Sequence, residues 1–171
     1  VPTTAYDSQT AANGSTSPAL TLRRSSETRL ASRINFRASS PRGLVSAMNS
    51  TRQEHDLGRL SVNSRLSRVA REYAKELARR QKLDHTDLKG NGPDKRVDES
   101  GYRWVYVAEN LAAGQKSAKD VVSDWMDSPP HRKALLSDKA VEVGIGYVAT
   151  TTDAKVDPFG SYWVAVFAKP R

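Results

Sequence analysis

The stretch Leu66-Ser-Arg-Val-Ala-Arg-Glu-Tyr-Ala-Lys-Glu-Leu-Ala78 contains the strongest fold signal in this chain. Its apolar residues recur every three or four positions, while arginine and lysine occupy the other faces. This is the pattern of an amphipathic helix with one buried face. Asn63 or Ser64 can cap its start, so we expect a helix of about five turns that packs on a core.

Shorter patterned segments lie on both sides of this helix. Apolar spacing predicts further helices over 44–52 and 118–126, and a short helix that starts at Pro129 with Ser128 as its N-cap. Aromatic and β-branched residues predict strands over 102–108, 141–148 and 161–167, the last two forming an antiparallel hairpin. Residues 84–101 are predicted to be a polar loop. Because helices precede strands, the expected class is α+β, with helices packed on an antiparallel sheet.

The composition limits the classes of protein that fit. The chain has 171 residues, a net charge of +8 and 37% hydrophobic residues, which suits one domain and includes no apolar run long enough to span a membrane. It has no cysteine. Disulfide scaffolds, cysteine-ligated zinc, iron–sulfur clusters and thiol nucleophiles are therefore excluded.

The composition changes near residue 43, which predicts a basic Ser/Arg-rich tail over 1–43 and a folded domain over 44–171. The tail has six arginines against two acidic residues, so it holds +4 of the total charge of +8. One interpretation is a disordered linker; the other is a segment that is ordered by docking on an acidic partner protein. The expected docking residues are Arg23, Arg24, Arg29, Arg33 and Arg37.

Three histidines and one glutamate are candidates for chemistry. His55 follows the first predicted helix and is expected to contact free carbonyls at its end. His85 lies just beyond the long helix, and His131 is the third residue of the short one, where the positive helix end favours a neutral imidazole. Glu109 lies between apolar residues, so it is either held in an ion pair or placed at the floor of a cleft. The pair of glycines in Gly144-Ile-Gly146 is expected to allow close packing.

The order of these residues resembles the CAP superfamily, which is named for cysteine-rich secretory proteins, antigen 5 and pathogenesis-related proteins. The resemblance is to its cysteine-free bacterial-type branch and covers about residues 44–168. Its strongest motifs are Asn49-Ser-Thr-Arg52, Glu109-Asn-Leu-Ala112, Trp125-Met-Asp-Ser-Pro-Pro-His-Arg132, Val143-Gly-Ile-Gly146 and Tyr162-Trp-Val-Ala-Val-Phe167.

The resemblance implies an α-β-α sandwich with a central antiparallel sheet flanked by helices. It also implies a cleft lined by two histidines and acidic residues, here His85, Glu109 and His131. A second acidic residue has no clear counterpart, with Asp124 and Asp127 as candidates, and Pro130 stands where the family usually has glycine. His85 and His131, together with the carboxylate of Glu109, are expected to be the ligands of any Zn²⁺ or other divalent cation. The alternative is that these three groups hydrogen-bond one another without a metal.

The resemblance implies a non-enzymatic binding module that is secreted. The basic tail predicts that this module docks on a partner assembly as an accessory subunit, and the Arg- and Ser-rich, acid-poor composition of the tail makes an organelle lumen the alternative location. A lipid- or sterol-binding secreted protein is the alternative. A metal-dependent hydrolase, with water held by His85 and His131 and Glu109 as general base, is less favoured. A nucleic-acid partner is not expected, because acidic residues crowd the central loop and no basic and aromatic platform is present.

Overall fold

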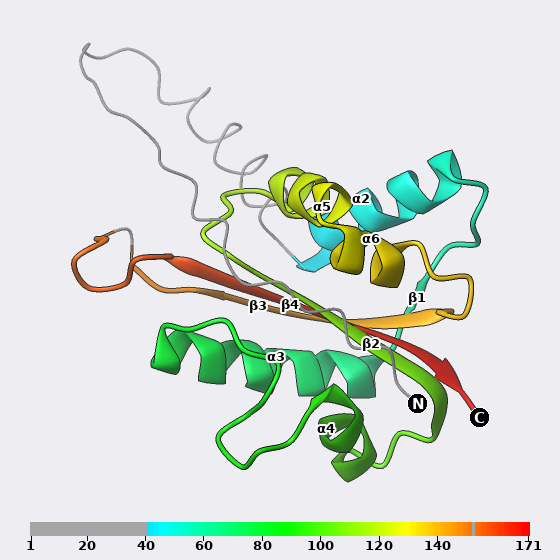
Figure 1. The fold of residues 1–171 in the computed structure, drawn as a ribbon, viewed down its shortest axis with the longest axis horizontal. Helices are drawn as coiled ribbons and strands as arrows, with labels where there is room; N and C mark the ends of the chain where they lie inside the picture. Colours follow the sequence, from blue (N-terminus) through cyan, green and yellow to red (C-terminus); the bar gives the residue numbers. More distant parts are fainter. Residues whose placement is uncertain (1–40, 152) are drawn as a thin grey trace, which may run out of the picture.

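A computed structural model, which describes residues 41–151 and 153–171, shows a sheet between two layers of helices (Figure 1). Helices α2, α5 and α6 cover one face of the sheet, and α3 and α4 cover the other. The elements are α2 (Pro41–Glu54), β1 (Ser61–Val62), α3 (Ser64–Arg80), α4 (Pro93–Glu99), β2 (Trp104–Ala113), α5 (Ala118–Asp127), α6 (Pro129–Leu135), β3 (Glu142–Ala149) and β4 (Ser161–Pro170). The predicted α-β-α sandwich is confirmed. Of the predicted tail, residues 1–40 lie outside the described residues and 41–43 begin α2.

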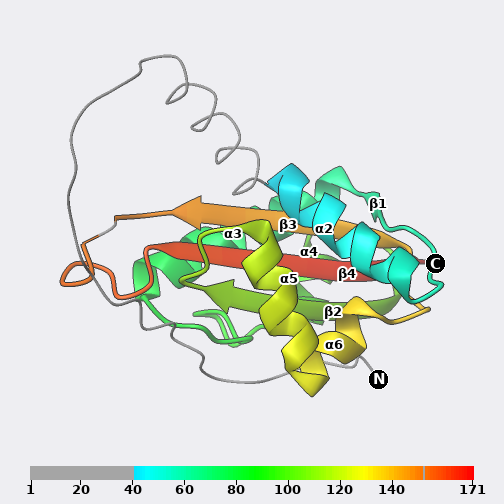
Figure 2. The ribbon, with the colours of Figure 1, turned by 90° about the horizontal axis from the view of Figure 1, so that it is seen from above.

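The sheet has the strand order β1-β3-β4-β2. The three long strands are antiparallel, as expected, and β3 and β4 form the predicted hairpin. The sheet is nevertheless mixed, because β1 pairs parallel with β3 through Ser61 and Val62. Two residues are too few to show an alternating pattern, so this strand could not be predicted. The order leaves β2 at an edge of the sheet, where Figure 2 shows it below α5 and α6.

Two sequence predictions need correction. Strand β2 runs five residues beyond the predicted end at Ala108, because Leu111, Ala112 and Ala113 pair with β4 despite the weak strand propensity of alanine. The segment predicted as a polar loop over 84–101 contains the helix α4, which begins with Gly92 as N-cap and Pro93 in the first turn. Seven residues are too short for a helical period to be visible in the sequence.

The core has two parts, one on each face of the sheet. Alternate residues of β4 supply both, since Trp163 and Phe167 face α2, α5 and α6, whereas Tyr162 and Val164 face α3. All four side chains are fully buried. Within the described residues, no helix is both long and apolar enough to cross a membrane.

Helix α3 lies directly against β3 at two glycines. A Cβ atom at Gly144 would overlap the backbone of Leu66 and Ser67, and one at Gly146 would overlap the backbone of Ala70. The predicted role of this glycine pair in close packing is confirmed. The contact sets the distance between the long helix and the sheet.

Arg52 is a buried basic residue with structural contacts. Its Nε donates to the carbonyl of Gly58 at 2.8 Å, and its Nη1 donates to those of Leu135 and Ser137 at 2.8 and 2.9 Å. Nη2 donates to the carbonyl of Ala140 at 3.3 Å. One guanidinium therefore joins the end of α2 to the segment between α6 and β3.

Candidate functional site

Glu109 and Asn110 lie next to each other on the edge strand β2 and face opposite sides of the sheet. Side chains alternate along a strand, and Leu111 belongs to the core on the α3 side while Ala108 belongs to the core on the α5 side. Glu109 therefore faces the layer of α3 and α4, and Asn110 faces the layer of α5 and α6. Two groups of polar residues are built around them.

The first group is centred on the carboxylate of Glu109, which is fully buried. Its Oε1 lies 2.9 Å from Nδ1 of His85, and its Oε2 lies 2.7 Å from Nη2 of Arg96. The side chains of His85 and Arg96 are themselves 9% and 8% exposed. Of the two interpretations of Glu109, the structure shows the ion pair, and it brings His85 to the same carboxylate. That these residues line a ligand cleft stays a prediction.

Arg96 is the residue of this group that sequence reasoning missed. Its Nη1 donates to the carbonyls of His85 and Asn91 at 3.0 and 2.8 Å, and its guanidinium carbon lies 3.5 Å from the centre of the Tyr73 ring. Arg96 therefore connects helix α4, to which it belongs, with three other parts of the chain. These are the loop that precedes α4, helix α3 and strand β2. The sequence contains a signal for this helix that was missed. Gly92-Pro93 marks a helix start, and the basic Arg96 and the apolar Val97 follow it within the first turns.

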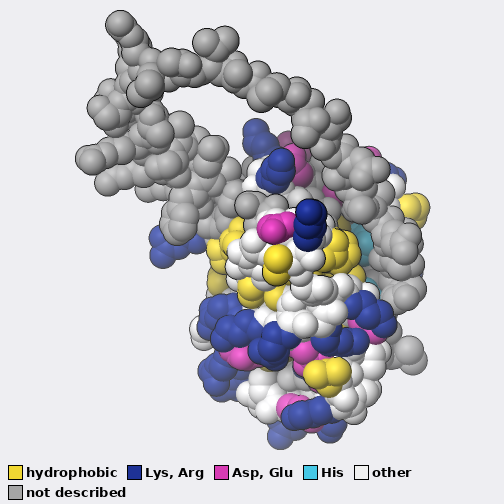
Figure 3. All heavy atoms as spheres, turned by 90° about the vertical axis from the view of Figure 1, so that its left-hand side faces the viewer, with side chains coloured by type: hydrophobic (Ala, Val, Ile, Leu, Met, Phe, Trp, Pro, Cys, Tyr) yellow, Lys and Arg dark blue, Asp and Glu magenta, His cyan; other side chains and the backbone are white. Residues whose placement is uncertain are grey.

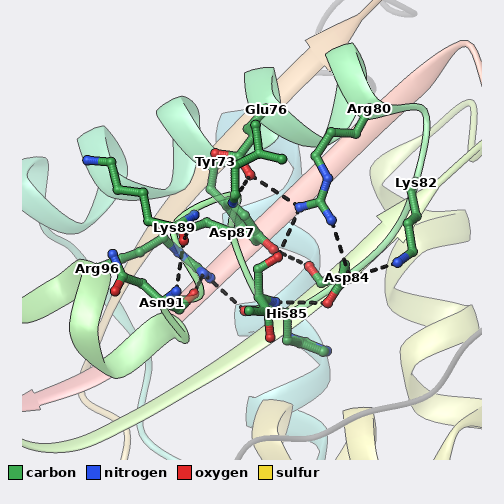
Figure 4. Close-up of polar contacts among 12 residues, drawn as sticks. Tyr73, Glu76, Arg80, Lys82, Asp84, His85, Asp87, Lys89, Asn91 and Arg96 are labelled. Atoms are coloured by element: carbon green, nitrogen blue, oxygen red, sulfur yellow. Dashed lines mark hydrogen bonds and ion pairs between the residues drawn. The ribbon is translucent and has the colours of Figure 1, made fainter.

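The loop that carries His85 is held by polar contacts on the α3 side (Figure 4). The hydroxyl of Tyr73 donates to the carbonyl of Asp84, and Arg80 donates to the carbonyl of Thr86 at 2.9 Å. The backbone N–H of Leu88 donates to Glu76 at 2.9 Å. These contacts fix the backbone on both sides of His85, and burial raises the pKa of the Tyr73 hydroxyl, which keeps it a donor.

Two aspartates accept hydrogen bonds from the backbone of the same loop. Hydrogen bonds from Lys82 and from the backbone N–H of Thr86 lower the pKa of Asp84. Burial works against the charge of Asp87, but hydrogen bonds from the backbone N–H groups of Asn91 and Lys89 outweigh it and lower the pKa of that carboxyl. Both carboxylates therefore remain charged acceptors at neutral pH and hold the turn.

The second group lies on the other face of β2. Nδ2 of Asn110 donates to the backbone carbonyl of His131 at 2.9 Å, while Oδ1 of Asn110 is buried and has no hydrogen bond within the described residues. His131 is 8% exposed. The structure thus links His85 and His131 to consecutive residues of β2, with His85 held through its side chain and His131 through its backbone.

Three smaller predictions have mixed outcomes. His55 contacts a carbonyl at the end of α2, since its Nδ1 lies 2.9 Å from the oxygen of Thr51, as expected. Ser128 is the N-cap of α6, as predicted, but its side chain forms no capping bond. Asp124 accepts a bond from Gln115 at 2.8 Å and Asp127 is exposed, so neither acidic candidate joins the Glu109 group as the structure describes it.

The described residues do not fit a divalent metal centre that includes Glu109. Both carboxylate oxygens are engaged, and Arg96 already supplies a positive charge at the position where a cation would bind. In residues 41–151 and 153–171, no group of three His, Cys, Asp or Glu side chains is arranged to hold a metal ion. A site built on the two histidines remains a prediction.

Comparison with known proteins identifies the family. A family model of the cysteine-rich secretory protein family, CAP, matches residues 45–167. This chain belongs to the CAP family. Its lack of cysteine agrees with the cysteine-free branch. An uncharacterized protein of Borreliella burgdorferi is 32% identical over 128 residues, which cover 75% of this chain and 77% of that protein.

Other relatives show that a CAP domain can be part of a longer protein. The uncharacterized protein YkwD of Bacillus subtilis is 30% identical over 124 residues, which are 72% of this chain but 45% of YkwD. This chain therefore matches less than half of that relative. An outer surface protein of Borrelia burgdorferi has a similar structure, with a TM-score of 0.67 and 28% identity over 75% of this chain and 90% of that one.

The predicted docking arginines, Arg23, Arg24, Arg29, Arg33 and Arg37, lie outside the described residues. The part of the chain that the structure describes has two surface depressions, with volumes of about 440 and 470 Å³. The first is next to Trp104 and Arg171, and the second lies between Tyr106 and the outer side of α6. His85, Glu109 and His131 line neither of these depressions, so the contacts around Glu109 define the candidate site.

Proposed function

We propose that this CAP domain is a non-enzymatic binding module that works outside the cytoplasm. The observation that carries the proposal is the engagement of both Glu109 oxygens, one by His85 and one by Arg96. A carboxylate in that state orients other side chains and is poorly placed to take a proton from water. The named location of the Borrelia burgdorferi outer surface protein supports the compartment. An organelle lumen is the alternative location.

In this proposal, Glu109 and Asn110 hold two histidine-bearing segments that receive the ligand. The carboxylate fixes the ring of His85 through Nδ1, and the amide of Asn110 fixes the start of α6 through the carbonyl of His131. The preorganised segments reduce the conformational entropy that a ligand must overcome on binding. The family resemblance implies three candidate ligands, namely a metal ion, a lipid and a sterol.

The experiment compares the full chain with its His131→Ala variant. ZnCl2 is titrated into each by calorimetry, and hydrolysis of p-nitrophenyl acetate is followed with and without Zn²⁺. We expect no Zn²⁺-dependent hydrolysis in either protein. Hydrolysis that needs Zn²⁺ and is lost in His131→Ala would contradict the non-enzymatic proposal and favour a metal-dependent hydrolase. Tight Zn²⁺ binding without hydrolysis, lost in the same variant, would identify a metal as the ligand, and saturable binding of fluorescent cholesterol would identify a sterol.

We further propose that the segment 1–43 docks the domain on an acidic partner surface, as its charge indicates. A polyglutamate column serves as the acidic probe for the full chain. Replacing Arg23, Arg24, Arg29, Arg33 and Arg37 with Gln should lower the salt concentration that elutes the protein. The matched variant replaces five exposed basic residues of the domain, Arg59, Lys95, Lys119, Lys133 and Lys139. Equal shifts in the two variants would contradict docking through the tail.

A further inference from the structure

Helix α3 accounts for the net charge of the folded domain. It contains six basic and two acidic residues, whereas 44–63 and 81–171 together contain fifteen of each. Helices α2, α5 and α6 in the opposite layer hold five basic and four acidic residues. Figure 3 shows basic side chains gathered in the lower half of the face it displays, at the level where Figure 1 places α3 and α4. The positive charge is thus concentrated in one layer.

Four of these basic residues form a row along the outer side of α3. Arg68, Arg71, Lys75 and Arg79 follow each other at intervals of three and four residues, so they share one face of the helix, and all four are exposed. At 1.5 Å per residue the row is about 17 Å long. The opposite side of α3 packs on the sheet through Leu66, Ala70, Tyr73, Ala74 and Leu77. The row therefore points away from the core.

Hydrogen bonds and ion pairs within the described residues leave three of the four basic side chains of the row unrestrained. Arg68, Arg71 and Arg79 form no hydrogen bond or ion pair there, while Lys75 pairs with Glu72 at 2.8 Å. The bond from Lys75, aided by Arg71, lowers the pKa of Glu72, so this glutamate stays charged. The basic residues at the flanks differ, because Arg65 donates to the carbonyl of Gly101 and Arg80 is held by Glu76 and Asp84.

We propose that this row docks the domain on an anionic phospholipid bilayer. The row is straight and lies on the convex outer side of a helix, so a flat surface can meet all four basic groups at once. Three of them are guanidinium groups, which form paired hydrogen bonds with phosphate oxygens. The row includes no aromatic side chain for stacking on nucleic-acid bases. This docking is independent of the ligand bound near His85.

The test measures cosedimentation of the full chain with phosphatidylcholine vesicles that contain or lack phosphatidylglycerol, at low and high salt. One variant carries Arg68→Gln, Arg71→Gln, Lys75→Gln and Arg79→Gln. The matched variant carries Lys95→Gln, Lys119→Gln, Lys133→Gln and Lys139→Gln, which removes the same charge from other exposed sites. Both keep the segment 1–43. Circular dichroism and thermal melting should be unchanged in both, since every replaced side chain is exposed.

We expect the wild type to bind the vesicles with phosphatidylglycerol and to be released by high salt. Each basic residue at an anionic surface contributes about fivefold to partitioning, so the α3 variant should bind at least tenfold more weakly and the matched variant within a few fold of wild type. Equal losses in the two variants, full binding by the α3 variant, or equal binding to vesicles without phosphatidylglycerol would overturn the proposal. Tighter binding to soluble polyphosphate through the same row would assign the row to a linear polyanion instead.

Discussion

Arg96 and Glu109 form a buried ion pair, with Nη2 and Oε2 2.7 Å apart. The pair places a permanent positive charge against the carboxylate that the family resemblance assigns to a ligand cleft. It also connects α4 to the edge strand of the sheet. The carboxylate of Glu109 therefore contacts both Arg96 and His85, and its charge is compensated within the chain.

Removing both partners of this pair should cost less than the sum of the two single removals. Glu109→Gln leaves a buried guanidinium without a counter-charge, so we expect the free energy of unfolding to fall by about 3–5 kcal/mol, and Arg96→Met should have a similar effect. The double variant should lose less than the sum of the two. Urea unfolding measures all three, with the exposed Glu99→Gln as control. Strictly additive losses would show that the two side chains are not coupled.

Arg52 should resist even conservative replacement. Lysine cannot reach the four carbonyls that the guanidinium binds, so Arg52→Lys should lower the free energy of unfolding by more than about 1 kcal/mol, and Arg52→Met by about 3 kcal/mol or more. Arg59→Lys is the matched control, because Arg59 is exposed. Thermal melting of the three variants checks the order. An Arg52→Lys protein as stable as wild type would refute the structural role.

A methyl group at either glycine of β3 should separate α3 from the sheet. Gly144→Ala and Gly146→Ala each add a carbon where backbone atoms already lie, and overpacking of this kind costs about 1–3 kcal/mol or more. Gly58→Ala is the control, because a Cβ at Gly58 would meet no atom within 4 Å. Chemical denaturation should show large losses only for the β3 variants. Comparable losses for all three would show that overlap with the backbone of α3 is not the cause, because the change in backbone entropy from Gly to Ala favours the folded state.

The stability of the domain should depend on pH through Asp157. Burial disfavours its charge, but hydrogen bonds from Thr150, from the backbone of Phe159 and from Tyr162 outweigh this effect and lower its pKa below the ordinary 3.8. The stabilisation is therefore complete above that value and is lost as the pH falls through the lower pKa of the folded state. Asp157→Asn should be about 1–3 kcal/mol less stable at neutral pH, and the difference should shrink in acid.

Equilibrium unfolding across the acid range measures this effect. The control is Asp127→Asn, at an exposed position, which should follow the wild-type curve. A difference between wild type and Asp157→Asn that stays constant as the pH falls would show that the charge of Asp157 is not responsible.

The sequence predicted the long elements of this fold because they have clear periods, and the family resemblance implied their arrangement in three layers. The helix from Leu66 to Ala78 and the strand from Ser161 to Phe167 lie where their patterns place them. Helix α4 was missed because seven mostly polar residues, about two turns, are too few to show a helical period. Arg96 was missed for the same reason, since its role depends on a helix that brings it to Glu109, 13 residues away. The family resemblance named His85 and Glu109, but only the folded chain showed which groups occupy the carboxylate.

The alternation of side chains on β2 makes the candidate site dependent on strand register. Glu109 lies opposite Val166 of β4, and Asn110 lies opposite Ala165. A slip of one residue would turn Glu109 toward α6 and Asn110 toward α4, and would separate both from their partners. The nine residue pairs that join β2 and β4 oppose such a slip. The contacts that β2 makes with the two histidine-bearing segments therefore form only when the edge strand has docked in its native alignment.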